Sequence, residues 1–246
     1  MAPKITVHWL RDSRSQRILW LLEELKLDYD IIEYNRDWQT FEIPDEGLEK
    51  GYKLKRFPMI ILEDADKGFP TPTTLAESGA IFDTLINLYG SPSTLAPAWS
   101  SGLSPADAYK YAFWSHWAEG TAMFHLVVYL VLCRTPAKFG FATSWMASFV
   151  CGAIVRAYIL PNLKKTFSFM EEELGDNEFF VGNKFTACDI LLSVPYELLR
   201  AIPANPTVSQ AEFPRLAAWF ERVSTREGHV QAEKRGSKSE LAPYFA

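Results

Sequence analysis

The sequence predicts two domains of different fold class, a small α/β domain followed by a larger all-helical domain. Strand-like and helix-like patterns alternate over residues 1–90. Beyond residue 104 the apolar residues recur at helical spacing, and no convincing strand pattern follows. A stretch rich in Ser, Pro and Gly at residues 91–104 separates the two patterns and indicates a linker. We therefore expect a second domain at residues 105–246.

Length and composition are those of a globular protein. The 246 residues are 48% hydrophobic and 14% aromatic, so the chain can bury a sizeable core. The formal net charge of -5 lacks the basic surplus of a general nucleic-acid binder, and we expect no nucleic-acid partner. The three cysteines, Cys133, Cys151 and Cys188, show neither a disulfide framework nor zinc-ligand spacing. We expect no metal site.

The N-terminal residues do not have the pattern of a secretion signal. Charged residues occur in the sequence MAPKITVHWLRDSRSQ before any apolar run of the required length. Together with the sparse cysteines, this predicts reduced thiols and a cytoplasmic location.

The first domain begins with a strand–helix–strand unit. Residues 5–10 (ITVHWL) are β-branched and aromatic and predict a strand. Apolar residues at i, i+3, i+4 and i+7 predict a helix over residues 15–25. A second strand is predicted at residues 29–34 (YDIIEY). This order implies a parallel crossover connection.

Two more strands and a helix complete the first domain. Residues 57–63 (FPMIILE) predict a third strand that opens with a proline. A turn region rich in Asp, Gly and Pro at residues 64–72 precedes a short fourth strand near residues 73–75. Helical spacing returns at residues 77–89. The resulting βαβ–ββα order is a thioredoxin-like layout.

The second domain is predicted to consist of long helices, at residues 105–133, 144–172, 187–200 and 213–226. Two apolar stretches within them, residues 123–133 and 145–163, call for a membrane check. The first is about half the length of a span, which needs roughly 20 residues. The second contains Arg156, which is costly inside lipid. We interpret both as buried helices, and peripheral contact with a membrane is the alternative.

Three short motifs in the first domain are candidates for ligand binding. Ser13 and Ser15 lie where the first strand meets the following helix, a place where backbone N–H groups and hydroxyls favour an anion. Residues 56–58 (Arg-Phe-Pro) contain an X-Pro bond, which in the cis form turns the preceding backbone toward a ligand. Glu77 and Ser78 start a helix that suits both an ammonium and a carboxylate, as on an α-amino acid. Taken singly, each motif also fits an ordinary cap or strand start.

Together, these motifs and the helical second half resemble the cytosolic glutathione transferases over essentially the whole chain. The stretch HWLRDSRSQRILWLLEELKLDYDIIEYNRD resembles the serine-type fungal and bacterial branch of that family. Residues 114–120 (WSHWAEG) and 180–190 (FVGNKFTACDI) match motifs of the same branch, and the latter ends in a Thr186–Asp189 capping box. The resemblance implies the glutathione transferase fold, a homodimer and glutathione as co-substrate.

The resemblance also implies the source of the reactive thiolate. Ser13 aligns with the catalytic serine of the family, whose hydroxyl donates to the glutathione sulfur; Ser15 is the alternative. Lowering a thiol pKa by two units takes roughly 2.7 kcal/mol. A charge-assisted hydrogen bond supplies about 1.5–3 kcal/mol and a helix N-terminus about 0.3–1 kcal/mol. A hydroxyl at a helix start therefore suffices, without a metal or a protein cysteine.

The remaining roles concern glutathione and the second substrate. The Phe57–Pro58 backbone would pair with the cysteinyl part, while Glu77 and Ser78 would hold the γ-glutamyl amino and carboxylate groups. Arg56, or alternatively Lys55, would lie near the glycyl carboxylate. For an apolar electrophile, candidate pocket residues on the first helix of the second domain are Tyr109, Phe113, Trp117 and Phe124, which are otherwise core or dimer contacts.

The sequence does not determine which reaction the thiolate performs. Conjugation to electrophiles, reduction of organic hydroperoxides and cleavage of aryl ethers would all use the same thiolate. A non-enzymatic ligand-binding or interaction module is the alternative from a different functional class.

Overall fold

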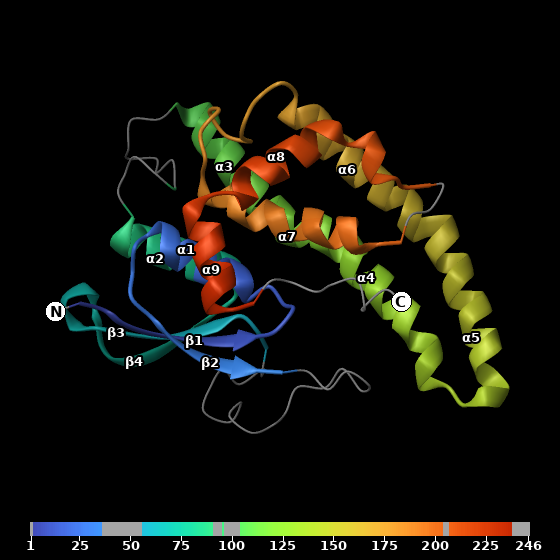
Figure 1. The fold of residues 1–246 in the computed structure, drawn as a ribbon, viewed down its shortest axis with the longest axis horizontal. Coiled ribbons are helices and arrows are strands. Elements are labelled where there is room, and N and C mark those ends of the chain that lie inside the picture. Colours follow the sequence, from blue (N-terminus) through green and yellow to red (C-terminus); the bar gives the residue numbers. More distant parts are fainter. Residues whose placement is uncertain (1, 36–55, 91–94, 96–103, 204–206, 238–246) are drawn as a thin grey trace. The chain divides into compact units, whose positions relative to one another are not determined.

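The computed structural model describes residues 2–35, 56–90, 95, 104–203 and 207–237. The chain forms two compact units (Figure 1), of which unit 1 comprises Met1–Gly102 with Ser224–Glu240 and unit 2 comprises Leu103–Val223 with Leu241–Ala246. This division differs from the predicted one at the C-terminus. The last described helix belongs to the α/β unit and not to the helical unit.

Unit 1 is built on a four-stranded sheet in the order β2-β1-β3-β4. The strands are β1 (Lys4–Leu10), β2 (Asp30–Tyr34), β3 (Met59–Asp64) and β4 (Phe69–Ala76). β1 and β2 pair in parallel, whereas β3 is antiparallel to both β1 and β4. Helix α1 (Gln16–Glu24) joins β1 to β2, and α2 (Ser78–Tyr89) follows β4. The predicted thioredoxin-like layout is confirmed.

The fourth strand is longer than the sequence predicts. β4 begins at Phe69, so the residues expected to form a turn up to residue 72 are partly extended and paired with β3. Pro70 and Pro72 account for the difference, because they suggest a turn yet are tolerated in a strand at the edge of a sheet. β4 is such an edge strand among the described residues.

Helix α9 (Glu227–Arg235) packs against α1 within unit 1. Two guanidinium nitrogens of Arg226 donate to the Glu24 carboxylate at 2.8 Å each, a bidentate pair. His229 meets the ring of Trp20 edge-on, with centroids 4.6 Å apart. The helix is polar in sequence, and its place in unit 1 depends on these contacts with residues about 200 positions earlier.

Unit 2 contains two continuous helical stretches of 34 residues each, Pro105–Lys138 and Phe141–Leu174. Each consists of two α-helices joined through a π-helical turn; these are α3 (Pro105–Trp117), α4 (Met123–Arg134), α5 (Phe141–Ile154) and α6 (Leu160–Leu174). Helices α7 (Ala187–Ala201) and α8 (Pro214–Ser224) complete the unit. The predicted helices are confirmed in kind and approximate length.

The expectation that the two apolar stretches are buried is wrong. Both 34-residue helices are long and apolar enough to cross a membrane by length and composition, and only 22% of the most apolar window of each is buried. Trp145, for example, is 68% exposed. Helical periodicity predicted the helix but could not show which sides meet another element, because apolar residues occur nearly all around this stretch.

The predicted capping box starts α7 and also anchors α8. The Asp189 carboxylate is fully buried and accepts a hydrogen bond from the Thr186 backbone N–H at 2.8 Å. It also accepts from the Trp219 indole N–H, 3.0 Å away, on α8. A backbone N–H from Phe180 approaches it at 3.4 Å. One carboxylate therefore ties together a loop and two helices.

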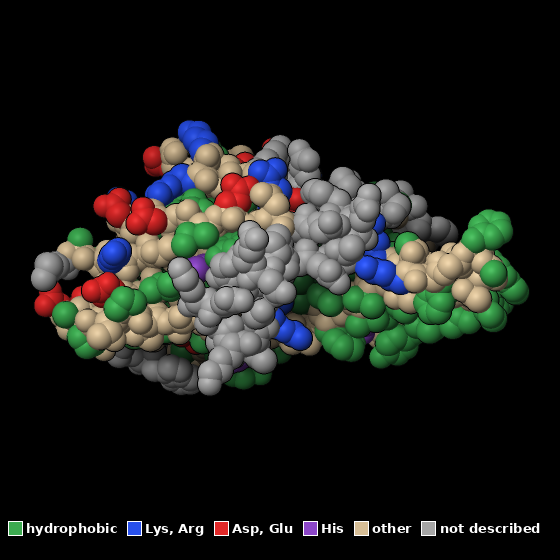
Figure 2. Space-filling view, turned by 90° about the horizontal axis from the view of Figure 1, so that it is seen from below, with side chains coloured by type: hydrophobic (Ala, Val, Ile, Leu, Met, Phe, Trp, Pro, Cys, Tyr) green, Lys and Arg blue, Asp and Glu red, His purple; other side chains and the backbone are tan. Residues whose placement is uncertain are grey.

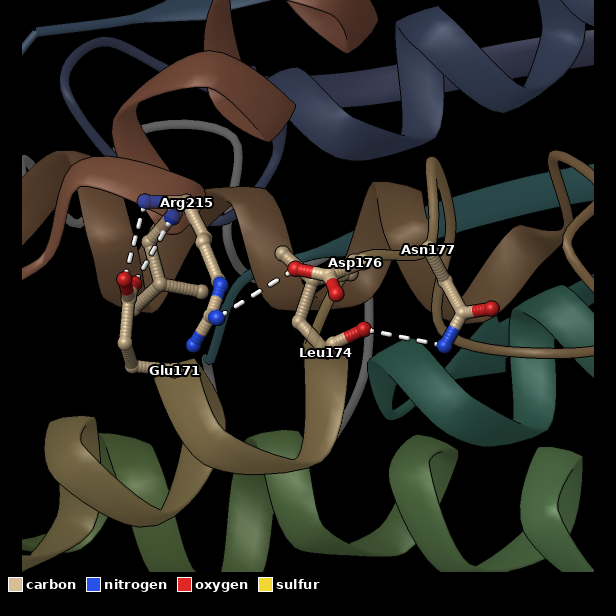
Figure 3. A network of polar contacts seen from close by, with 6 residues as sticks. Glu171, Leu174, Asp176, Asn177 and Arg215 are labelled. Atoms are coloured by element: carbon tan, nitrogen blue, oxygen red, sulfur yellow. Dashed lines mark hydrogen bonds and ion pairs between the residues drawn. The ribbon is translucent and has the colours of Figure 1, made fainter.

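A second buried carboxylate caps the N-terminus of α8. Glu171, near the end of α6, accepts from the backbone N–H groups of Arg215 and Leu216, each at 2.9 Å (Figure 3). These donors belong to the first turn of α8, where backbone N–H groups lack helical partners and negative charge is favoured. The Arg215 guanidinium also contacts Asp176 at 3.2 Å. Glu171 thus connects the end of α6 to the start of α8.

Replacing Glu171 by alanine is expected to destabilise the protein by about 2–4 kcal/mol, because the buried N–H of Leu216 and the partly buried N–H of Arg215 lose a charged acceptor. Urea unfolding followed by circular dichroism measures this loss. The neighbouring carboxylate of Glu172 is exposed, so Glu172→Ala serves as the matched control. Equal stability of the two variants would contradict the capping role.

Candidate functional site

Five residues predicted to bind glutathione line one cavity in unit 1. The cavity has a volume of about 240 Å³. Its lining residues are Arg14, Arg56, Phe57, Pro58, Ala76, Glu77 and Ser78. Segments that are far apart in the sequence therefore meet at one place: the start of α1, the approach to β3 and the junction of β4 with α2.

Strand register explains why these segments meet. Met59 of β3 is paired with Ala76 of β4, which brings the residues just before β3 close to those just after β4. The Phe57–Pro58 peptide bond is cis, as expected. The ring of Phe57 packs against Tyr34 of β2, with centroids 5.0 Å apart.

A buried histidine holds the Tyr34 side chain in this packing. His8 of β1 is buried, and its Nδ1 lies 2.8 Å from the Tyr34 hydroxyl. Burial lowers the pKa of His8, so the neutral ring is favoured. His8 and Tyr34 therefore hold the ring of Phe57 in place with uncharged groups.

The junction of β4 and α2 has the features of an anion site. Glu77 is the N-cap of α2 and has a φ of 70°, a conformation that costs a non-glycine residue about 1–3 kcal/mol. Backbone strain of this kind is concentrated at binding sites. Ser78, the first helical residue, is buried and lines the cavity. The N-cap side chain makes no capping hydrogen bond, which leaves the first-turn N–H groups of α2 for a ligand.

The two serines at the start of α1 differ in exposure. Ser15 is 0% exposed, whereas Ser13 is partly exposed. The Ser13 hydroxyl lies 2.7 Å from the Leu10 carbonyl oxygen and 3.0 Å from Ser15 Oγ. A hydroxyl has one proton, so Ser13 must turn away from these acceptors to donate to a ligand. This geometry favours Ser13 over Ser15 as the group that a ligand can reach.

Arg14 was missed by the sequence reasoning, although it lies between the two candidate serines. It lines the cavity, whereas Ser13 itself does not. An arginine at the start of a helix, beside an expected anion site, was the available signal. Arg56 also lines the cavity, and the alternative, Lys55, lies outside the described residues.

The four aromatic residues proposed for an electrophile pocket do not converge on one point of unit 2. Trp117 is buried, and its ring lies 6.0 Å from that of Phe169. Phe113 contacts the same ring at 6.2 Å and that of Tyr109 at 6.2 Å. Tyr109 and Phe124 are exposed, at 65% and 54%. Phe113 and Trp117 are thus part of an aromatic cluster within the unit.

Comparison with known proteins places the chain in a family. Residues 145–227 match the family described as glutathione S-transferase, C-terminal domain. The chain is 30% identical to Glutathione S-transferase 3 of Schizosaccharomyces pombe, over 94% of this chain and 87% of that protein. It is 29% identical to Glutathione S-transferase 1 of Saccharomyces cerevisiae, over 95% of each.

A solved glutathione transferase structure has the same fold as this chain. The glutathione transferase homolog from Lodderomyces elongisporus, determined with two GSH per subunit, has a TM-score of 0.69 and 20% identity, covering 94% of this chain and 98% of that chain. Sequence identity over nearly the whole length, together with this fold, shows that the chain belongs to the glutathione S-transferase family of enzymes.

Proposed function

We propose that this protein binds glutathione in the unit 1 cavity and uses Ser13 to activate its thiol for attack on electrophilic small molecules. The observation that carries the proposal is the convergence of Arg14, Arg56, the Phe57–Pro58 backbone, Glu77 and Ser78 on one cavity. The relatives named glutathione S-transferases and the glutathione-bound neighbour support this ligand.

The charges of the cavity complement those of glutathione. The peptide carries an ammonium and a carboxylate on its γ-glutamyl end and a second carboxylate on its glycyl end. Ser78 and the N-terminus of α2 suit the first carboxylate, and Glu77 suits the ammonium. The guanidinium of Arg56 suits the glycyl carboxylate. The backbone of Phe57 would then pair with the central cysteinyl residue.

The chemical step needs a thiolate near neutral pH. A hydrogen bond from the Ser13 hydroxyl stabilises the anion over the thiol, and the N-terminus of α1 adds to this effect. The thiol proton passes to solvent, and the sulfur then forms a bond to an electrophilic carbon as the leaving group departs. With an organic hydroperoxide, the same sulfur would attack the terminal oxygen and release the alcohol, and the resulting glutathione sulfenic acid would react with a second glutathione to give glutathione disulfide and water. We also propose a homodimer in the cytoplasm, with Tyr109, Phe113, Trp117 and Phe124 among the candidates for contact with an apolar electrophile.

Binding is tested by the melting temperature in the presence of glutathione. A ligand at one hundred times its dissociation constant stabilises the native state by about 2.7 kcal/mol, which raises the melting temperature. The substitution Glu77→Gln removes the charged partner of the ammonium and is expected to weaken binding about 10- to 100-fold. The shift at a fixed glutathione concentration should therefore shrink or vanish.

Glu63→Gln is the matched control, because Glu63 lies on β3 and does not line the cavity. The control should keep the shift of the unmodified protein. If millimolar glutathione does not raise the melting temperature of the unmodified protein, the chain is instead a non-enzymatic module that uses the same fold.

A further inference from the structure

The cavity of unit 1 carries an excess of positive charge that the rest of the unit does not have. Its described lining residues include two guanidiniums, those of Arg14 and Arg56, and one carboxylate, that of Glu77. The described residues of unit 1 as a whole contain more Asp and Glu than Lys and Arg. Figure 2 shows several acidic side chains on the surface of this unit, at the left end of the view. Positive charge is thus concentrated where the ligand is proposed to bind.

The charged ends of glutathione use one of the two guanidiniums. In the arrangement proposed above, Glu77 takes the ammonium, and Ser78 with the N-terminus of α2 takes the γ-glutamyl carboxylate. Arg56 takes the glycyl carboxylate. A third negative charge appears on the peptide only when its thiol loses the proton to solvent. Among the described lining residues, Arg14 carries the positive charge that matches this thiolate.

Arg14 lies at the end of α1 where the sulfur is proposed to bind. It follows Ser13 directly, two residues before α1 begins, and its side chain lines the cavity. Arg56 comes from the segment before β3, and Glu77 from the junction of β4 with α2. Of the charged side chains on the described lining, Arg14 is therefore the one whose backbone adjoins the proposed thiolate donor.

The hydrogen bonds of Ser13 show why a second group is useful at this place. The Ser13 hydroxyl donates to the Leu10 carbonyl oxygen at 2.7 Å, and Ser15 Oγ lies within 3.0 Å as a second acceptor. A hydroxyl has one proton, so donation to the sulfur gives up the bond to Leu10 and part of the stabilisation with it. A guanidinium has five N–H donors and a permanent charge, so Arg14 can stabilise an anion while it keeps other contacts.

We propose that the Arg14 guanidinium contacts the sulfur of bound glutathione and stabilises the thiolate together with Ser13. An opposite charge within about 4–6 Å lowers the pKa of an acid by about 1–3 units. Arg14 is partly exposed, and solvent weakens its field, so we expect an effect at the lower end of this range. This proposal rests on the proposed binding of glutathione in the unit 1 cavity.

The ultraviolet absorbance of the thiolate tests the proposal directly. Glutathione bound to the full-length protein is titrated with base, and the appearance of the thiolate gives the pKa of the bound thiol. Arg14→Gln should raise this pKa by about one unit, and Arg14→Lys, which keeps the charge, should raise it less. Turnover with a chloronitroarene at a pH below both values should fall about tenfold in Arg14→Gln, because less thiolate is present. An unchanged pKa in Arg14→Gln would overturn the proposal.

A ligand without a thiol separates this role from the binding of a carboxylate. S-methylglutathione has the same charged ends as glutathione but cannot form a thiolate. Arg14→Gln should therefore leave its dissociation constant, measured by titration calorimetry, within a few-fold of that of the unmodified protein. If the variant instead binds S-methylglutathione at least tenfold more weakly and the pKa of bound glutathione does not change, Arg14 holds a carboxylate and the proposal is wrong.

Arg11→Gln is the matched control for Arg14→Gln. Arg11 lies three residues earlier, pairs with Glu33 at 3.1 Å and does not line the cavity. This variant should keep the pKa and the dissociation constant of the unmodified protein, and circular dichroism confirms that each variant is folded. If the unmodified protein binds neither glutathione nor S-methylglutathione, the proposed function fails and the role of Arg14 fails with it. Binding of both ligands with the same thiol pKa in Arg14→Gln overturns the role of Arg14 alone.

Discussion

Replacement of Ser13 by alanine is expected to lower turnover of glutathione with an electrophile by tenfold or more. The substitution removes the hydroxyl that donates to the thiolate, a hydrogen bond whose loss costs about 1.5–3 kcal/mol and hence about 10- to 100-fold in rate. Affinity for glutathione should change only a few-fold, because the cavity groups that hold both ends of the peptide remain. Steady-state kinetics with a chloronitroarene separate the two effects.

The pH dependence gives a second readout of the same substitution. If Ser13 stabilises the thiolate, its loss raises the pKa of bound glutathione toward the value of a free thiol, near 8.5. The pH profile of turnover should therefore move to higher pH, and the rate deficit should shrink in alkaline solution. A defect that is the same at all pH values would indicate a role in positioning instead.

Ser15→Ala is the matched control for Ser13→Ala. Ser15 is completely buried, and its backbone N–H donates to Ser13 Oγ at 3.1 Å. Removing its hydroxyl should cost some stability but leave turnover within a few-fold of the unmodified protein. If Ser15→Ala loses turnover and Ser13→Ala does not, the assignment of the two serines is reversed.

Local patterns predicted most of unit 1, because its strands and helices carry distinct periodicities. The cluster of candidate site residues was also foreseeable in outline, since each motif lies at the end of a strand or the start of a helix. Strand pairing then brings them together, as the register of Met59 with Ala76 shows. Arg14 was missed although its place at a helix start beside the expected anion site was a signal, because a solvated arginine is equally common at such a position.

The features that sequence could not supply depend on contacts between distant residues. The polar helix α9 joins unit 1 through Arg226 and Glu24, which no local pattern relates. Hydropathy identified the apolar stretches of α4 and α5 but could not tell a buried helix from an exposed one. The same apolar composition is compatible with a core, a dimer contact or a lipid surface, and the exposure of Trp145 and its neighbours excludes only the core of the unit.

Replacement of Asp189 by alanine is expected to give the largest loss of stability, about 3–5 kcal/mol. The substitution leaves the N–H donors of Thr186 and Trp219 buried without an acceptor. Each unsatisfied donor costs about 1–3 kcal/mol, and the cost is larger when the lost acceptor is a buried charged group. Chemical denaturation measures the difference. Asp176→Ala is the control, because the Asp176 side chain is 96% exposed and its surface ion pair contributes at most about 1 kcal/mol. Equal stabilities would contradict the role of Asp189.

The same carboxylate should give the stability a characteristic dependence on pH. Burial raises the pKa of Asp189 from 3.8 to about 6, although the hydrogen bonds from Thr186 and Trp219 oppose this shift. Between these values the folded state binds the proton and the unfolded state releases it, so this group favours folding less as the pH rises from about 4 to about 6. Asp189→Asn removes the titrating group while keeping the shape of the side chain. The difference in unfolding free energy between this variant and the unmodified protein should therefore change between about pH 4 and pH 6 and stay constant above pH 6. A difference that is independent of pH would mean that Asp189 has the same pKa in the folded and the unfolded protein.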